Sequence, residues 1–168
     1  MLDNFSATSF EFRLAVITLA KKSFVVANIY RPANLSSSVS LEELSNLVAN
    51  IYVDFAGNLL LLGDLNSPDS SPDTVGDDLC ELLMTINLTE FVREQTRGKN
   101  LLDVVATDDP AAALDMTVDD CGLISDRRLV VFKTRTRIGR GRTIRYSYSN
   151  TEDLDTANLT GADGEWLD

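Results

Sequence analysis

The chain has 168 residues, of which 44% are hydrophobic and 24% are charged, a composition typical of a globular protein and unlike that of a fibrous or wholly disordered chain. Fifteen Lys and Arg residues against 26 Asp and Glu residues give a net charge of −11, which argues against a protein whose whole surface binds nucleic acid. The chain contains no histidine, and this excludes a Ser-His-Asp triad and a histidine-ligated zinc site.

The charges are distributed unevenly along the chain. Residues 1–131 hold 20 acids and nine bases, residues 132–148 hold six bases and no acid, and residues 149–168 hold six acids and no base. This partition predicts a folded body over residues 10–132, a basic linker over 133–148 and an acidic tail over 149–168.

The sequence carries no signal for a membrane or for secretion. Its longest apolar runs, 14–20 and 59–62, are far shorter than the roughly 20 residues of a membrane helix. The start of the chain lacks the positive charge and apolar stretch of a signal peptide. Cys80 and Cys121 lie far apart without CxxC spacing, which predicts buried thiols in a reducing compartment. We therefore expect a cytoplasmic or nuclear protein that is not secreted.

The first half of the chain predicts a hairpin followed by a helix. Residues 10–19 and 23–30 are rich in β-branched and aromatic residues and are separated by a short polar turn, as in two paired strands. Residues 40–43, Ser-Leu-Glu-Glu, form a capping-box pattern. Apolar residues at helical spacing follow it: Leu44, Leu47, Val48, Ile51 and Phe55.

The second half of the predicted body alternates strands with one more helix. Residues 58–63 form a short apolar run typical of a strand buried on both faces, and a helix is predicted at about 77–86. Residues 89–93 are predicted to be extended, and strands are predicted at 101–107 and 128–133. Strands interleaved with helices predict an α/β layered fold.

Polar residues follow the buried strand at 58–63. The run Gly63-Asp64-Leu65-Asn66 places a carboxylate and a carboxamide two residues apart, at the end of a strand where site residues collect in α/β sheets. On its own such a run is more typical of a turn in which Asp and Asn bond local backbone groups than of a site.

Several further motifs occur in a fixed order around this run. A strand ends in Tyr30 followed by Arg-Pro, Thr96-Arg97 precedes a strand containing Leu102-Asp103, and Ser125-Asp126 precedes the last strand of the predicted body. In this order, over about residues 10–132, the chain resembles the second half of the endonuclease/exonuclease/phosphatase superfamily. Within that superfamily it is most similar to the endonuclease domain of non-LTR retrotransposons. The resemblance implies an α/β fold, a layered β-sandwich with flanking helices, that is truncated at its N-terminus.

The resemblance also implies roles for the matching residues in a Mg²⁺-dependent phosphodiester hydrolase that acts on DNA. Asp64 would orient or deprotonate the attacking water and help to hold the metal, and Asn66 would hold the water or the phosphate. Asp126 would contact the metal, whose preference for oxygen ligands suits carboxylates. Asp103 would support the catalytic histidine of the family. Tyr30 and Thr96 would contact phosphate oxygens.

Two departures from the family pattern bear on activity. The Ser-Asp-His motif of the family is Ser125-Asp126-Arg127 here, and arginine stays protonated, so Arg127 can bind phosphate but cannot exchange a proton. With Arg127 in this position we expect Asp103 or Asp126 to form an ion pair. The metal-binding Glu of the family lies in its first half, which the resemblance does not cover. Glu11 is the only acid in the first predicted strand and has the position of a solvent-facing residue, so we expect no counterpart of that Glu. We therefore expect activity to be absent or very low and any Mg²⁺ to be weakly bound or absent.

Three functions remain open at this stage. The chain is a degenerate retroelement endonuclease domain, or a nucleic-acid-binding or protein-interaction module that uses the basic stretch 133–142, or an active phosphodiesterase completed by another chain. A chain that holds mainly one lobe is also expected to expose an apolar sheet face and to self-associate through it. The residues expected on that face are Phe12, Leu14, Val16 and Val25, or their alternates along the same strands.

Overall fold

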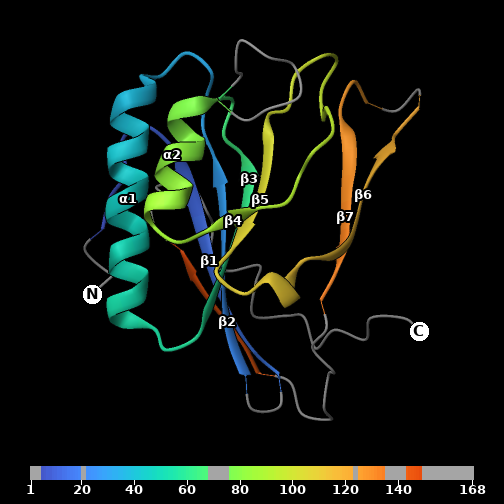
Figure 1. Ribbon diagram of the computed structural model, residues 1–168. Coiled ribbons are helices and arrows are strands. Elements are labelled where there is room, and N and C mark those ends of the chain that lie inside the picture. Colours follow the sequence, from blue (N-terminus) through green and yellow to red (C-terminus); the bar gives the residue numbers. More distant parts are fainter. Residues whose placement is uncertain (1–4, 20–21, 68–75, 123–124, 135–142, 149–168) are drawn as a thin grey trace, which may run out of the picture.

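A six-stranded mixed sheet with two helices on one of its faces forms the body of the protein in the computed structural model (Figure 1). The structure describes residues 5–19, 22–67, 76–122, 125–134 and 143–148. The strand order is β4-β5-β3-β2-β1-β8, and β6 and β7 form a separate two-stranded sheet. The elements are β1 Glu11–Leu19, β2 Lys22–Tyr30, α1 Ser37–Asp54, β3 Asn58–Asp64, α2 Asp77–Thr85, β4 Thr89–Glu90, β5 Asp103–Thr107, β6 Leu114–Asp120, β7 Arg128–Lys133 and β8 Thr143–Tyr148.

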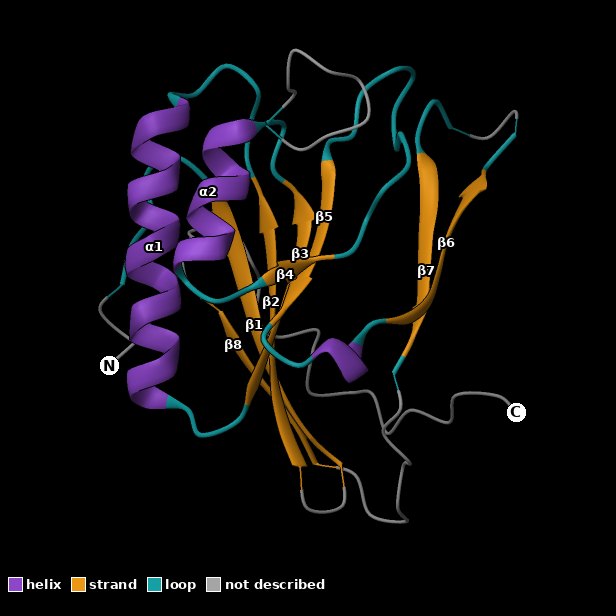
Figure 2. Cartoon of the chain, in the orientation of Figure 1, coloured by secondary structure: helices purple, strands orange, loops and turns teal. Residues whose placement is uncertain are grey.

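The predicted α/β fold is confirmed, and its first four elements are those expected from the sequence. β1 and β2 pair antiparallel as a hairpin. β2 and β3 are parallel neighbours joined through α1, so α1 crosses over the sheet and covers one face (Figure 2). The predicted helix at 77–86 is α2.

The capping box predicted at residues 40–43 is wrong. α1 begins at Ser37, and the Ser40 hydroxyl donates to the Ser36 carbonyl oxygen at 2.7 Å instead of capping the helix. The Glu43 carboxylate accepts bonds from the backbone and hydroxyl groups of Thr8 and Ser9, at 2.6 to 3.0 Å. These bonds lower the pKa of Glu43 against the opposing effect of its burial. Glu43 therefore fastens the N-terminal segment to α1, a contact that no local pattern could indicate.

The two faces of the sheet differ in what covers them. Phe12, Leu14 and Val25 are buried in the core with the helix residues Leu47 and Ile51. Phe12, Leu14 and Val25 were predicted, with Val16, to line an exposed apolar face of the sheet. For these three residues the prediction is wrong, because they are buried under the helices. Their alternates lie on the opposite face, and three of these are only half-buried: Ala15, Ile17 and Val26.

Two strands were not predicted from the sequence. β6 has acidic residues at three of its seven positions and a register shift between Leu114 and Thr117, so it lacks regular apolar alternation. β8 lies within the segment predicted to be a basic linker, and it pairs antiparallel with β1 as an edge strand. The folded body thus includes residues 143–148, beyond the expected limit at 132. The predicted acidic tail, 149–168, lies outside the described residues.

Two smaller expectations concern the cysteines and the membrane. Cys80 and Cys121 are half-buried, so they are less enclosed than predicted. In the described parts of the chain, no helix combines the length and apolar character needed to cross a membrane.

Candidate functional site

Three strands bring polar residues to one edge of the sheet. β2 ends at Tyr30, β3 ends at Asp64 and β5 begins at Asp103. The pairing places Tyr30 opposite Asp64, and Asp64 opposite Asp103. Residues opposite each other in a ladder share one face of the sheet. Three residues that are up to 73 positions apart in the sequence are therefore neighbours on the face that the helices do not cover.

Asp64 and Arg127 form the central contact of this edge. Asp64 is 7% exposed, and its Oδ2 accepts a bond from Arg127 Nη1 at 2.5 Å. Its Oδ1 accepts the Asn66 backbone N–H at 3.0 Å. The bond to Asp64 and the nearby charges of Asp64, Asp103 and Asp126 raise the pKa of Arg127, outweighing the opposing effect of its burial. The predicted ion pair of Arg127 therefore exists, but its partner is Asp64 and neither Asp103 nor Asp126.

Asp103 is held by Thr96. The Thr96 hydroxyl oxygen accepts the backbone N–H groups of Leu102 at 3.1 Å and of Asp103 at 3.2 Å, and the hydroxyl also bonds the Asp103 side chain. Burial raises the pKa of Asp103, and the charge of Asp64 raises it further. The hydrogen bond with Thr96 and the charge of Arg127 lower the same pKa, but they do not cancel the rise. Thr96 was predicted to contact phosphate, but it is fully buried and serves to position Asp103.

Asp126, predicted as a metal ligand, lies on the exposed side of the edge. Its Oδ2 accepts a bond from Arg97 Nε at 2.8 Å, and its side chain is 66% exposed. The backbones of Arg97 and Arg127 form an antiparallel bridge, and the Arg128 N–H donates to the Thr96 carbonyl at 2.8 Å. This bridge attaches the start of β7 to the loop before β5.

The residues as arranged do not fit a divalent metal ion. Mg²⁺ requires several oxygen ligands in near-octahedral geometry. Asp64 and Asp126 each bond a different guanidinium, and a fixed positive charge beside a carboxylate opposes binding of a second cation. Within the ranges that the structure describes, no group of three or more His, Cys, Asp or Glu side chains is placed to hold a metal.

A clamp built on Arg31 fixes the turn after β3. The Arg31 guanidinium donates to the carbonyl oxygens of Leu35 at 2.9 Å, Leu65 at 2.6 Å and Asn66. Asn66 Nδ2 donates to the Arg31 carbonyl at 2.7 Å, so this amide, predicted to hold water or phosphate, is engaged with the backbone. Burial lowers the pKa of Arg31 and the charge of Asp64 raises it. Sequence analysis missed Arg31, because a charged residue after a strand resembles a surface position.

The turn also depends on Gly63. Its φ is +139°, and a Cβ there would lie 1.8 Å from the Ile29 carbonyl oxygen of the neighbouring strand. Only glycine allows β2 and β3 to approach so closely just before Asp64. Asn66, with φ +42°, completes the turn in the left-handed region that Asn tolerates.

Tyr30 and Glu11, the two remaining residues considered in the sequence analysis, are both exposed. Tyr30 is 45% exposed at the edge of the site. Glu11 is exposed and lies opposite Tyr30 on β1, as expected for a solvent-facing strand residue. Neither has a described bond to Asp64 or Asp103.

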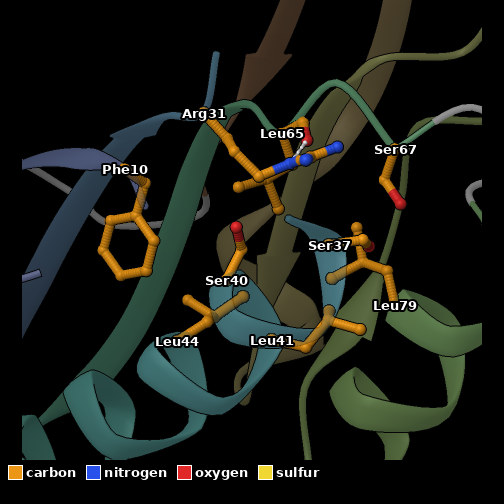
Figure 3. Close-up of a pocket in the computed structure, with 9 residues that line it drawn as sticks. All are labelled: Phe10, Arg31, Ser37, Ser40, Leu41, Leu44, Leu65, Ser67 and Leu79. Atoms are coloured by element: carbon orange, nitrogen blue, oxygen red, sulfur yellow. Dashed lines mark hydrogen bonds between the residues drawn. The ribbon is translucent and has the colours of Figure 1, made fainter. Parts of the chain in front are cut away.

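A small hollow lies on the helix side of the Arg31 clamp (Figure 3). It is lined mainly by apolar side chains, among them those of Phe10, Leu41, Leu44 and Leu79. Arg31 projects beside it with its bond to the Leu65 carbonyl drawn, so the one charged group of the lining is committed to the backbone. The lining includes none of the predicted site residues, although Leu65 directly follows Asp64 in the chain.

Comparison with known proteins agrees with this architecture at the level of the fold. No protein-family profile matches the sequence, and no curated protein is significantly similar to it. Among solved structures, the chain is similar to the endonuclease domain of TRAS1, a telomere-specific non-LTR retrotransposon, with a TM-score of 0.58 and 17% sequence identity. The match covers 74% of this chain and 64% of that domain. Over the matched part of the chain, the protein therefore has the fold of that endonuclease domain.

Proposed function

We propose that the chain is the second part of a retroelement endonuclease domain, related to Mg²⁺-dependent phosphodiester hydrolases, and that it has little or no nuclease activity of its own. The observation that carries the proposal is the bond of 2.5 Å between Arg127 and Asp64. The carboxylate that would orient the attacking water is held by a guanidinium, which stays protonated and cannot serve as a general acid or base. Loss of a general acid or base typically lowers a rate by roughly two to four orders of magnitude.

A nicking assay tests this proposal. The purified protein is incubated with supercoiled plasmid and with an abasic-site duplex in Mg²⁺ or Mn²⁺, and Asp64→Ala serves as the matched control. We expect both proteins to give only background nicking. Metal-dependent nicking by the parent that disappears in Asp64→Ala would show an active hydrolase.

The variant Arg127→His sharpens the test. It supplies the missing imidazole but leaves the metal-binding Glu of the family without a counterpart, so we expect no turnover. Strong Mg²⁺-dependent cleavage by this variant would show that the lost histidine alone accounts for the inactivity. Activity that appears only when a second polypeptide is added would support the alternative of a phosphodiesterase completed by another chain.

A nucleic-acid-binding function without catalysis is the second candidate. It is favoured by two arginines that are exposed at the site edge, Arg97 at 45% and Arg127 at 41% of their side-chain surface. The basic stretch proposed for binding, 133–142, lies mostly outside the described residues.

A further inference from the structure

Arg97 and Arg127 form an unusual pair on the site edge. Their backbones are directly opposite in an antiparallel bridge, and opposite residues in such a bridge project from the same face with Cβ atoms roughly 5 Å apart. Like charges in this position normally repel and destabilise the pairing. The arrangement therefore requires compensation from other groups.

Two carboxylates supply that compensation. Asp126 accepts one bond from Arg97 at 2.8 Å, and Asp64 accepts one from Arg127 at 2.5 Å. Each guanidinium has five N–H donors. Since 45% and 41% of the two side-chain surfaces are exposed, donors beyond those used by the carboxylates are accessible to solvent.

The carboxylates also fix the two guanidiniums in space. An arginine free in solvent loses side-chain entropy when it binds a ligand, and anchoring reduces this loss. A guanidinium suits phosphate because its planar fork can bond two oxygens of one group. Two anchored forks on one face thus make a preorganised surface for phosphate oxygens.

We propose that Arg97 and Arg127 form a metal-independent binding site for the phosphodiester groups of nucleic acid, with Asp126 and Asp64 as the anchors of the two guanidiniums. The inference rests on the proposed non-catalytic function and specifies its ligand. In this site the guanidinium of Arg127 provides next to Asp64 the positive charge that a divalent ion would otherwise provide. Binding consequently needs no added metal.

The test measures binding of a labelled single-stranded oligonucleotide to the full chain by fluorescence anisotropy, in EDTA and in Mg²⁺ at matched ionic strength. We expect the same affinity in both buffers. We also expect Arg97→Gln and Arg127→Gln each to weaken binding roughly tenfold, and each to reduce the slope of log K against log salt by about 0.7, the value for one phosphate contact on a single strand. Arg93→Gln is the charge-matched control, because Arg93 lies outside the basic stretch 133–142, is paired with Glu90 and has a side chain that is 68% exposed.

Arg97→Gln keeps the test valid if Arg127→Gln fails to fold, because the pair of Arg97 with the exposed Asp126 contributes little to stability. Inorganic phosphate should displace the oligonucleotide at lower ionic strength than chloride does, since it competes for the same guanidiniums. Binding that requires Mg²⁺, or that falls equally in Arg93→Gln, would overturn the site. So would equal displacement by the two salts, or no binding at all. Each of these results leaves the proposed lack of nuclease activity standing, because that proposal is tested separately by nicking.

Discussion

Each end of the β3–β5 pair holds a buried or partly buried carboxylate, and the two carboxylates take hydrogen bonds from different kinds of donor. At one end, Asp108 accepts bonds from the Leu59 N–H at 3.0 Å, the Asn58 amide at 3.2 Å and the Tyr52 hydroxyl at 3.1 Å. At the other end, Asp64 lies opposite a second acid, Asp103, and is bonded by the Arg127 guanidinium. Neutral donors are sufficient for an isolated carboxylate, whereas two adjacent carboxylates repel each other and need a cation. At the end that holds Asp64 and Asp103, called the site end below, removing the cation Arg127 would therefore leave two carboxylates facing each other without a neutralising charge.

The largest effect on stability is expected for Gly63→Ala, which tests whether the close approach of β2 and β3 at the site end tolerates a Cβ atom. The new Cβ would lie 1.8 Å from the Ile29 carbonyl oxygen, and two paired strands cannot move apart locally. We expect a loss of more than about 4 kcal/mol in the free energy of unfolding, measured by urea denaturation. Gly98→Ala is the control. Gly98 also has a positive φ, +58°, but no atom within 4 Å, so a loss of about 1 kcal/mol is expected there. Equal losses at the two positions would contradict the close strand approach.

Arg127→Gln is expected to cost about 2 kcal/mol at pH 7. This is less than for a fully buried pair, because 41% of the Arg127 side chain is exposed. The loss should depend on pH in a defined direction. Arg127 lowers the pKa of Asp103, which burial has already raised, so its removal raises that pKa further above the unfolded value. The deficit is then full at pH 7 and shrinks as the pH falls toward 4. A deficit that does not change with pH would show that packing, not charge, accounts for it.

Glu90→Gln examines a third carboxylate, on the helix side of the sheet. Burial raises the pKa of Glu90 to about 7, although Arg93 bonds it, and the Arg93 side chain is 68% exposed. A folded pKa above the unfolded one means that the contribution of the neutral form is complete below pH 4.5 and is lost as the pH rises through about 7. The stability of the variant relative to the parent should therefore increase by roughly 2 to 3 kcal/mol between pH 5 and pH 8. Parallel pH profiles of the two proteins would show that Glu90 is charged throughout.

Asp108→Asn tests the other end of the β3–β5 pair, where the carboxylate is bonded by uncharged donors. The amide keeps the shape of the side chain and one acceptor oxygen, and the donors that it meets carry no charge. We expect a loss of about 1 kcal/mol that is the same at pH 5 and pH 8. Thermal unfolding at these two pH values measures it, and a loss as large and as pH-dependent as that of Arg127→Gln would remove the distinction between the two ends.

The smallest effect is expected for Asp126→Asn. Its bond to Arg97 joins two side chains that are 66% and 45% exposed, and such surface pairs contribute less than about 0.5 kcal/mol. Stability should be almost unchanged in urea denaturation. A loss above 1 kcal/mol would mean that Asp126 has a structural role as well as anchoring Arg97.

The sequence by itself determined the elements whose signals are local. The alternation of β1 and β2, the apolar run of β3 and the helical spacing of α1 each follow from burial of side chains at a fixed period, so they could be read without knowledge of the fold. The ordered motifs also placed Tyr30 and Asp64 at the ends of their strands, and they placed Asp103 within a strand that in fact begins at this residue. Local patterns failed for β6, which is acidic and irregular, and for β8, an edge strand in a basic segment.

Only the tertiary structure decided which partner each charged group takes. Nothing near Arg127 in the sequence indicates that it bonds Asp64, 63 positions away, rather than its neighbour Asp126. The same holds for Glu43, which bonds Thr8 and Ser9 instead of capping its own helix, and for Thr96, which is fully buried and accepts the backbone N–H of Asp103. An ion pair depends on distance and burial in three dimensions, and one carboxylate can satisfy any nearby donor. Residue types and their order therefore predict where charged groups gather, while the packing of the strands determines which of them neutralise one another.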